Sequence, residues 1–529
     1  MGENDKKLSR RQFLIEAGRW MAAAAGLGLA GVAFTAGVAS DSPAFVGYPF
    51  SLGVASGDPL PDGVVLWTRL APDPLHRGGM PNETVPVQWE LAADDRFAEP
   101  VQRGVAYARP ELGHSVHVET SGLAANQVYY YRFRYGDEIS PTGRTKTLPP
   151  SDALATRCAF AFASCQNYED GYFTAYRHMS HEDLDFVLHL GDYIYEGGAK
   201  FSGVRRHEGG ETVTLADYRN RYALYRSDPD LQAAHAAFPW IAVLDDHEVD
   251  NNWAGAGSPE SGPIDRFVRR RAAAFQAYYE HMPLRMSSMP NGGSMRLYRR
   301  FQYGTLATFH VLDTRQYRDA QADRRNWGPP NERMRREART LLGEEQEAWL
   351  LDGLTESGAV WNVAAQQVFF ARRDGDLTDG VSVSKDAWDG YPAARERILR
   401  CVRERRVRNF MVLTGDVHAN WANEILSDFD RPTSKPIGVE WVGTSISSAG
   451  DGSDRTSRTD AELAHNPHLK FFNGNRGYVV CRVNADEWRT DYRIVPYVTR
   501  RGAPVLTRAT FVVASGNLRL RQTYGSERG

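Results

Sequence analysis

The sequence predicts an α/β protein in which a small all-β domain precedes a larger domain of alternating strands and helices. Residues 48–149 contain short β-branched and aromatic runs separated by turns rich in glycine, proline and aspartate, a pattern typical of an immunoglobulin- or fibronectin-like sandwich. After residue 150, nearly continuous apolar runs alternate with helical stretches, which favours helices covering a buried sheet. We therefore expect a β-sandwich at 48–149 and an α/β sandwich at 155–515.

The composition is that of an ordinary globular chain. Of the 529 residues, 42% are hydrophobic, which is enough apolar material for a large core. The 63 lysines and arginines against 66 aspartates and glutamates leave a net charge of −3. Because such a chain has no strong basic field, no specific nucleic-acid partner is indicated. Four cysteines are too few for a disulfide scaffold of this size.

Residues 1–39 have the features of an export signal. Lys6 and Lys7 precede Ser9-Arg10-Arg11-Gln12-Phe13-Leu14, and an alanine- and glycine-rich run extends from residue 21 to 39. The paired arginines resemble the twin-arginine signal, which is read by a receptor. We predict export by the twin-arginine machinery and a periplasmic or secreted location. The alternative is a membrane anchor, since the run is just long enough to span a bilayer.

The strands of the first domain are predicted from their β-branched and aromatic content. They are 63–68, 85–91 and 128–133, and the polar–aromatic alternation at 131–135 suits a half-buried strand. Prolines at 141, 149 and 150 mark the end of the domain. No catalytic constellation is found in this part of the chain.

Four apolar runs of the second domain predict strands buried on both faces: 158–163, 186–190, 240–244 and 410–413. Helices are expected between them, among others at 266–279 and 344–354.

Each of these four strands is followed by a polar cluster. The clusters are Ser164–Asn167, Gly191–Glu196, Asp245–Asn252 and Thr414–Asn420. In α/β sheets, ligands bind beyond the carboxyl ends of the strands, so we expect the four clusters to converge. Singly, each has an ordinary explanation, such as a helix cap or a buried thiol. Together they supply a thiol, a phenol, carboxylates, imidazoles and amides, which predicts a metal site.

These motifs resemble a known family. Gly191-Asp192-x-x-Tyr195, Asp246-His247 and Gly415-Asp416-Val417-His418 look like the calcineurin-like metallophosphoesterase pattern. A closer resemblance is to the PhoD-type alkaline phosphatases, through Ser164–Gln166, Leu188–Glu196, Asp245–Glu248, Gly53–Pro59 and Leu66–Arg69. The resemblance implies a metallophosphoesterase α/β sandwich with a small N-terminal β domain.

The resemblance also implies the cofactors Fe³⁺ and Ca²⁺, with more than one calcium ion. Asp192 matches the aspartate that bridges the ions, and the iron ligands match Cys165, Tyr195 and His418. The implied calcium ligands are Asn252, Asp416 and, as a further candidate, Asp451.

The remaining implied roles are catalytic. Asp246 and His247 are expected to act with Asp192, and their roles as ligand, supporting group or proton donor stay open. The general superfamily pattern ends in Gly-His-x-His, whereas here Asp416 occupies the place of the first histidine. An oxygen ligand at that place favours a harder cation, in agreement with calcium.

The resulting hypothesis is an exported hydrolase of phosphomonoesters or phosphodiesters that uses a metal-activated oxygen nucleophile. Phosphoester hydrolysis needs positive charge at the phosphoryl oxygens and a nucleophile that is available near neutral pH. A trivalent ion supplies the charge and acidifies bound water, so it meets both needs. The substrate would be a small-molecule or lipid phosphoester. The alternatives are a phospholipase D-like phosphodiesterase and a non-catalytic secreted binding protein whose metals are structural.

Overall fold

The computed structural model describes residues 47–258, 262–323 and 325–525. The predicted export signal at 1–39 lies outside these residues. Within the described ranges, no helix combines the length and apolarity needed to cross a bilayer.

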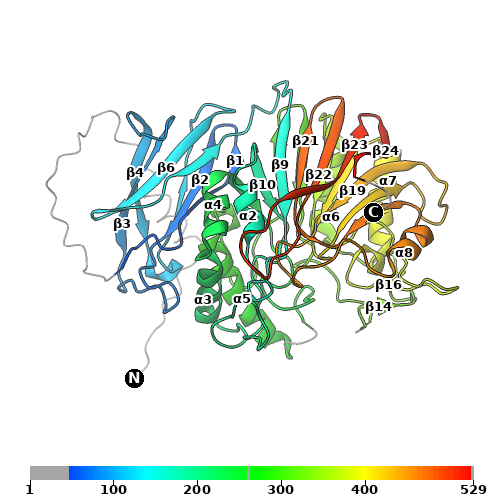
Figure 1. Cartoon of the computed structure of the whole chain (residues 1–529), viewed down its shortest axis with the longest axis horizontal. Helices are drawn as coiled ribbons and strands as arrows, with labels where there is room; N and C mark the ends of the chain where they lie inside the picture. Colours follow the sequence, from blue (N-terminus) through cyan, green and yellow to red (C-terminus); the bar gives the residue numbers. More distant parts are fainter. Residues whose placement is uncertain (1–46, 259–261, 324, 526–529) are drawn as a thin grey trace. The chain divides into compact units, whose positions relative to one another are not determined.

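Three parallel strands form the middle of a ten-stranded sheet (Figure 1). They are β9 (Cys158–Ala163), β10 (Phe186–His189) and β11 (Pro239–Ala242), and every residue in them is buried. They confirm the strands that were predicted from the first three apolar runs. Burial on both faces explains why their sequences are continuously apolar rather than alternating.

Further strands extend this sheet on both sides. Beyond β9 come β21 (Arg476–Val483), β22 (Glu487–Val495), β23 (Leu506–Ala514) and β24 (Asn517–Tyr524). Beyond β11 come β1 (Val54–Leu60), β2 (Gly63–Arg69) and β5 (Ser115–Glu119), with β1 parallel to β11. The N-terminal strands thus continue the large sheet.

The fourth predicted strand belongs to a different sheet. It is β17 (Phe410–Thr414), which lies in a seven-stranded sheet of order β12-β13-β15-β17-β19-β18-β20. The other members are β12 (Arg299–Tyr303), β13 (Ala307–Val311), β15 (Trp361–Ala365), β19 (Pro436–Val442), β18 (Asn420–Leu426) and β20 (Leu469–Asn473). The four polar clusters therefore follow strands of two different sheets. The sequence does not distinguish these sheets, because buried strands of either one are continuously apolar.

The two sheets pack face to face through an aromatic core. The ring of Phe309 on β13 meets Phe160 on β9 and Phe186 on β10 edge-on, with centroids 5.2 and 5.3 Å apart. Such T-shaped contacts are the favoured geometry for aromatic pairs. The α/β sandwich is thereby confirmed.

Helices cover the outer faces of both sheets. Residues of α3 (Leu215–Arg226) and α5 (Ile264–His281) share one core cluster with β10 and β11, while α6 (Gly343–Glu356) and α7 (Pro392–Glu404) share another with β15 and β17. The helices expected at 266–279 and 344–354 are α5 and α6. Among the residues that the structure describes, the remaining helices are α2 (Thr174–Met179), α4 (Pro229–Ala237), α8 (Thr459–His465) and the short η1 (Pro110–Leu112), η2 (Met286–Ser288) and η3 (Trp388–Gly390).

Helix starts follow the local sequence. Thr214 caps α3 by accepting from the backbone of Asp217, whose carboxylate in turn accepts from the backbone of Thr214. Asp228 caps α4, which has Pro229 in its first turn. Both arrangements satisfy amide groups that a helix leaves unpaired at its start.

A five-stranded sheet completes the N-terminal part. It contains β4 (Pro100–Ala108), β3 (Val85–Ala92), β6 (Val128–Tyr135), β7 (Glu138–Ile139) and β8 (Gly143–Lys146). The apolar face of this five-stranded sheet shares a core with Val64 and Leu66 of β2. Elsewhere in the chain, β14 (Trp327–Gly328) and β16 (Val383–Ser384) form a separate two-stranded pair. The division at 48–149 and 155–515 stays a prediction, since β1 hydrogen-bonds to β11 across it.

Candidate metal centre

The backbone takes left-handed turns where polar residues follow the strands. Five of the predicted metal-binding residues have positive φ: Cys165 (60°), Asp192 (56°), Asn252 (54°), Asp416 (63°) and His418 (53°). Few residues other than glycine adopt this conformation, because the Cβ atom crowds the backbone. Such strain concentrates at functional sites, where the surrounding fold holds it in place.

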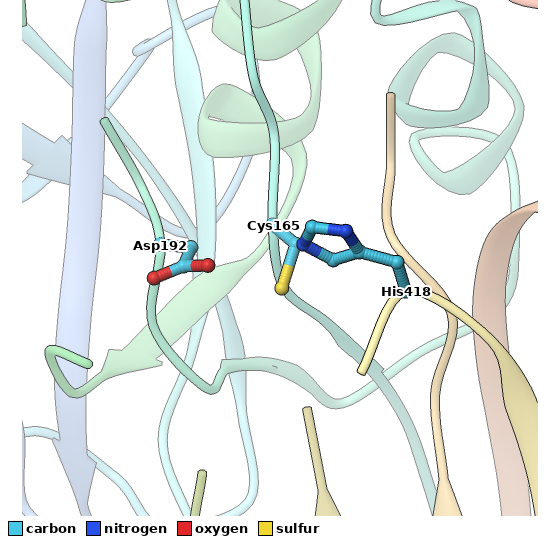
Figure 2. Close-up of side chains that lie close together, drawn as sticks. All are labelled: Cys165, Asp192 and His418. Carbon is cyan, nitrogen blue, oxygen red and sulfur yellow. The ribbon is translucent and has the colours of Figure 1, made fainter. Parts of the chain in front are cut away.

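The first group of candidate ligands joins both sheets. Cys165 follows β9, Asp192 follows β10, and His418 follows β17 of the opposite sheet. One ligand atom from each lies within 4.8 Å of the others, as Figure 2 illustrates. The sandwich thus brings together three residues that are far apart in sequence.

Tyr195 completes this group. Its hydroxyl donates to Asp192 Oδ2 at 2.9 Å and lies 3.2 Å from His418 Nε2. The hydroxyl of Ser448 donates to the same phenol oxygen at 2.7 Å. All four residues that the resemblance assigns to iron therefore converge.

Two further groups adjoin the first. Asp192, Asp246 and His247 form one, and Asp245, Asp246 and Asp416 form the other, each with ligand atoms within 4.8 Å of one another. Because Asp192 and Asp246 each belong to two groups, the three are continuous. The thiol and phenol lie at one end, and an all-carboxylate group lies at the other.

His247 is held in a defined orientation. Its Nδ1 lies 2.7 Å from Glu196 Oε2, and its ring stacks on Tyr195 with centroids 4.2 Å apart. Burial alone would lower the pKa of His247, but the carboxylates of Glu196 and Asp192 outweigh it and raise the pKa well above its ordinary value. Glu196 Oε2 is thereby placed to accept a hydrogen bond from Nδ1.

Arg315 is a member of the centre that the sequence analysis missed. Its fully buried guanidinium contacts Asp245 and lies 3.0 Å from Asp386, 3.6 Å from Asp246 and 4.0 Å from Asp416. A signal was present, because Asp313-Thr314-Arg315-Gln316 follows buried strand β13 just as the other clusters follow theirs. Glu196 lies in the predicted cluster Gly191–Glu196, but nothing in the sequence indicates its contact with His247.

The protein groups alone leave the centre electrostatically unbalanced. Burial raises the pKa of the Cys165 thiol, the Tyr195 phenol and the Asp192 carboxyl well above their ordinary values. Three buried carboxylate oxygens, Asp192 Oδ1, Asp245 Oδ2 and Asp246 Oδ1, have no hydrogen-bond donor among the described residues. Buried acceptors without donors are costly, and bound cations would satisfy them.

The donor set fits two kinds of cation. Thiolate, phenolate and imidazole groups suit a transition metal such as iron, whereas a group of carboxylates suits a hard cation such as calcium. The residues present therefore fit the ions that the resemblance implies.

The last two predicted ligands lie differently. Asn252 adjoins the centre, since its backbone N–H donates to Asp246 Oδ2 at 2.7 Å. Asp451 is in none of the three groups, and its carboxylate accepts from the backbone amides of Val498 and Thr499 at 2.7 and 2.9 Å. The geometry of Asp451 is that of a loop cap.

Comparison with known proteins places the chain in a family. Residues 160–492 match the model of the PhoD-like phosphatase family, and residues 31–149 match that of its N-terminal domain. The chain is 54% identical over 518 residues to alkaline phosphatase D of Bacillus subtilis (strain 168), covering 97% of this chain and 89% of that protein. A solved structure described as that of PhoD is 55% identical, covers 92% of this chain and 95% of its own, and superposes with a TM-score of 0.90. The chain belongs to the PhoD-like phosphatases.

Proposed function

We propose that this protein is an exported phosphoester hydrolase of the alkaline phosphatase D type that works with iron and calcium. As a PhoD-like phosphatase, the chain is a phosphoric ester hydrolase. The observation that carries the finer proposal is the continuity of a thiol–phenol–imidazole group with a carboxylate group through Asp192 and Asp246.

Each ion has a set of residues suited to it. Cys165, Tyr195 and His418 would hold ferric iron, while Asp416 and Asn252 would hold calcium, and Asp192 would be shared. Bound there, the ions supply positive charge for the phosphoryl oxygens and an oxygen nucleophile at neutral pH.

His247 has the position of a proton donor. Glu196 occupies its Nδ1 side, so Nε2–H is the group that can donate to the oxygen of the departing alcohol. Asp192 and Asp246 fix the spacing of the neighbouring groups, which keeps the phosphoryl group aligned with His247.

Metal analysis together with phosphoester turnover tests the iron assignment. Cys165→Ser should lose its iron and reduce kcat at least about 100-fold, because a serine hydroxyl replaces a thiolate poorly. Cys158→Ser is the matched control, since Cys158 is also buried and lies on β9. Wild-type iron content in Cys165→Ser would overturn the assignment.

Selective removal of calcium tests the division of labour. A mild chelator should abolish turnover while iron stays bound, and added calcium should restore it, because carboxylates hold calcium in a labile shell. Asp416→Ala should need more calcium for half-maximal turnover. Full activity after exhaustive removal of calcium would contradict the proposal.

Substrate comparison separates the remaining alternatives. Rates on a chromogenic phosphomonoester, the matching diester and phosphatidylcholine vesicles distinguish a phosphatase from a phosphodiesterase and from a phospholipase D-like enzyme. Absence of turnover on all three by metal-loaded protein would favour the binding protein.

The export proposal rests on Arg10 and Arg11. Replacing both by lysine should leave precursor and activity inside the cell, because the receptor reads the paired guanidinium groups. Replacing Lys6 and Lys7 by arginine keeps the charge and serves as the control. Undiminished activity outside the cytoplasm in the first variant would disprove the twin-arginine route.

A further inference from the structure

Residues 195–197 connect two parts of the metal centre without regular secondary structure of their own. The phenol of Tyr195 donates to Asp192, and the carboxylate of the next residue, Glu196, lies 2.7 Å from His247 Nδ1. The segment belongs to neither a helix nor a strand. The groups that bond to its backbone therefore decide where both side chains lie.

The hydroxyl of Tyr225 on α3 is the first of these groups. Tyr225 is fully buried, and its hydroxyl oxygen accepts from the backbone N–H of Tyr195 at 3.2 Å and from that of Tyr168 at 3.1 Å. With two amides donating to it, the phenol has its own hydrogen left for His207 Nε2, which is 3.0 Å away. Nδ1 of the neutral imidazole then carries the ring hydrogen and donates to the carbonyl of Gly197 at 3.0 Å.

Arg221 on the same helix holds the carbonyl groups of the segment. Its buried guanidinium donates to the carbonyls of Tyr195 and Gly197, the latter at 2.8 Å, and to that of Gly210 at 3.0 Å. Arg221 and Tyr225 are four positions apart, so they lie on one face of α3. The N–H and the C=O of Tyr195 are thus both bonded to that face.

We propose that Tyr225 is a positioning residue of the metal centre. By accepting from the amide of Tyr195, its hydroxyl directs the phenol toward Asp192 and, through the adjacent residue, keeps Glu196 beside His247. Without that hydroxyl, two buried amide groups would lose their acceptor, and the segment would move to find another. A small displacement of this kind misaligns groups that have to act together. The proposal rests on the proposed function, which gives Tyr195 and His247 their roles.

Tyr225→Phe tests the proposal, because it removes the hydroxyl and keeps the ring. Backbone hydrogen exchange in residues 193–198 should become about tenfold faster, since the amide of Tyr195 loses its acceptor. Transfer of iron to a chelator should be several-fold faster, and kcat should fall about tenfold or more while KM changes less than about twofold.

Tyr222→Phe is the matched control. Tyr222 lies on the same helix and is also fully buried, but its hydroxyl has no hydrogen-bond partner among the described residues. Its exchange, iron release and kcat should stay at wild-type values. Equal values for the two variants would overturn the proposal. Faster exchange throughout the protein in Tyr225→Phe, rather than in residues 193–198, would show a merely structural role and would overturn it as well.

A second pair of variants leaves Tyr225 in place and changes its partner. In His207→Leu the phenol hydrogen loses its acceptor and competes with the two amides, so exchange in residues 193–198 should again accelerate. His207→Gln should restore the slow exchange, because a side-chain amide offers both an acceptor and a donor. Equal exchange in these two variants would contradict the network. If the wild-type protein neither holds iron nor hydrolyses any phosphoester, the proposed function fails, while hydrogen exchange still decides whether Tyr225 fixes the segment.

Discussion

Arg315 has an unusual position for a charged side chain, since it is fully buried between four carboxylates. A permanent cation there compensates part of the acidic charge even when no ion is bound. Burial opposes the charge of Arg315, yet Asp245 and Asp246 raise its pKa well above the ordinary value. We interpret Arg315 as a positioning residue that holds the carboxylate group together.

Replacing Arg315 by methionine should therefore destabilise the fold strongly. Loss of one partner from a buried charge network typically costs about 3–5 kcal/mol, and urea unfolding of the metal-loaded protein measures it. Arg157→Met is the control, because the Arg157–Asp183 pair is exposed and such pairs contribute about 0–1 kcal/mol. Equal unfolding free energies for the two variants would contradict this interpretation.

At the residue scale, the sequence predicts some members of the metal centre and not others. Cys165, Asp192 and His418 were identified because each follows an apolar run that had to be a buried strand. Arg315 was missed because an arginine in a polar stretch usually faces solvent, and only tertiary packing reveals its burial. Positive φ angles cannot be read from residues such as Cys165 either, since nothing in a cysteine favours them.

At the scale of single elements, Glu440 on β19 holds several segments near the centre together. One carboxylate oxygen accepts from Phe370 N and Thr414 Oγ1, both at 2.7 Å, and the other accepts from Ala371 N and Asn423 Nδ2, both at 2.9 Å. Thr414 ends β17 just before Asp416. Glu440 thereby positions the loop that carries Asp416 and His418.

Glu440→Gln should cost about 3 kcal/mol or more, because an amide NH₂ would face two donors in either orientation. Glu424→Gln is a matched control on neighbouring β18: its Oε1 accepts from Leu520 N, a contact that an amide oxygen can keep. Its Oε2 makes only long ion pairs, with Lys470 at 3.5 Å and Arg519 at 3.9 Å. Chemical denaturation measures both. A Glu440→Gln protein as stable as Glu424→Gln would show that the network contributes little.

Strand positions were predictable at this scale, but sheet membership was not. The runs at 158–163 and 410–413 are both continuously apolar, yet β9 and β17 belong to opposite sheets. Hydrophobicity reports burial on both faces and carries no information about the neighbouring strand. The convergence of the polar clusters was correctly expected, although the sandwich rather than one sheet edge produces it.

For the molecule as a whole, buried neutral histidines lower the stability of the fold at acid pH. Burial lowers the pKa of His189 to about 3, and His117, His207, His310 and His468 are lowered to between about 3 and 4 for the same main reason. The unfolded chain binds these protons near pH 6.5. Between the two pKa values the unfolded state holds more protons, so stability falls as the pH decreases.

His189 offers a direct test, because neither of its ring nitrogens has a hydrogen-bond partner among the described residues. At pH 5.5, one histidine that stays neutral in the folded state lowers the free energy of unfolding by about 1.4 kcal/mol, whereas at pH 7.5 the effect is close to zero. The free energy of unfolding of His189→Phe should therefore decrease less between these pH values, by about that amount. The same decrease in both proteins would rule out His189 as a contributor.

The position of β9 has a consequence for the timing of folding. Phe162 on β9 pairs with Val479 on β21, so a strand at the middle of the large sheet obtains one of its two neighbours from near the end of the chain. Until the ribosome has made β21, that edge of β9 stays open, and pairings so distant in sequence form slowly. During most of its synthesis the nascent chain therefore has an unpaired, apolar strand edge that could pair with other chains. Aggregation is thus a greater risk while the chain folds than after the native sheet is complete.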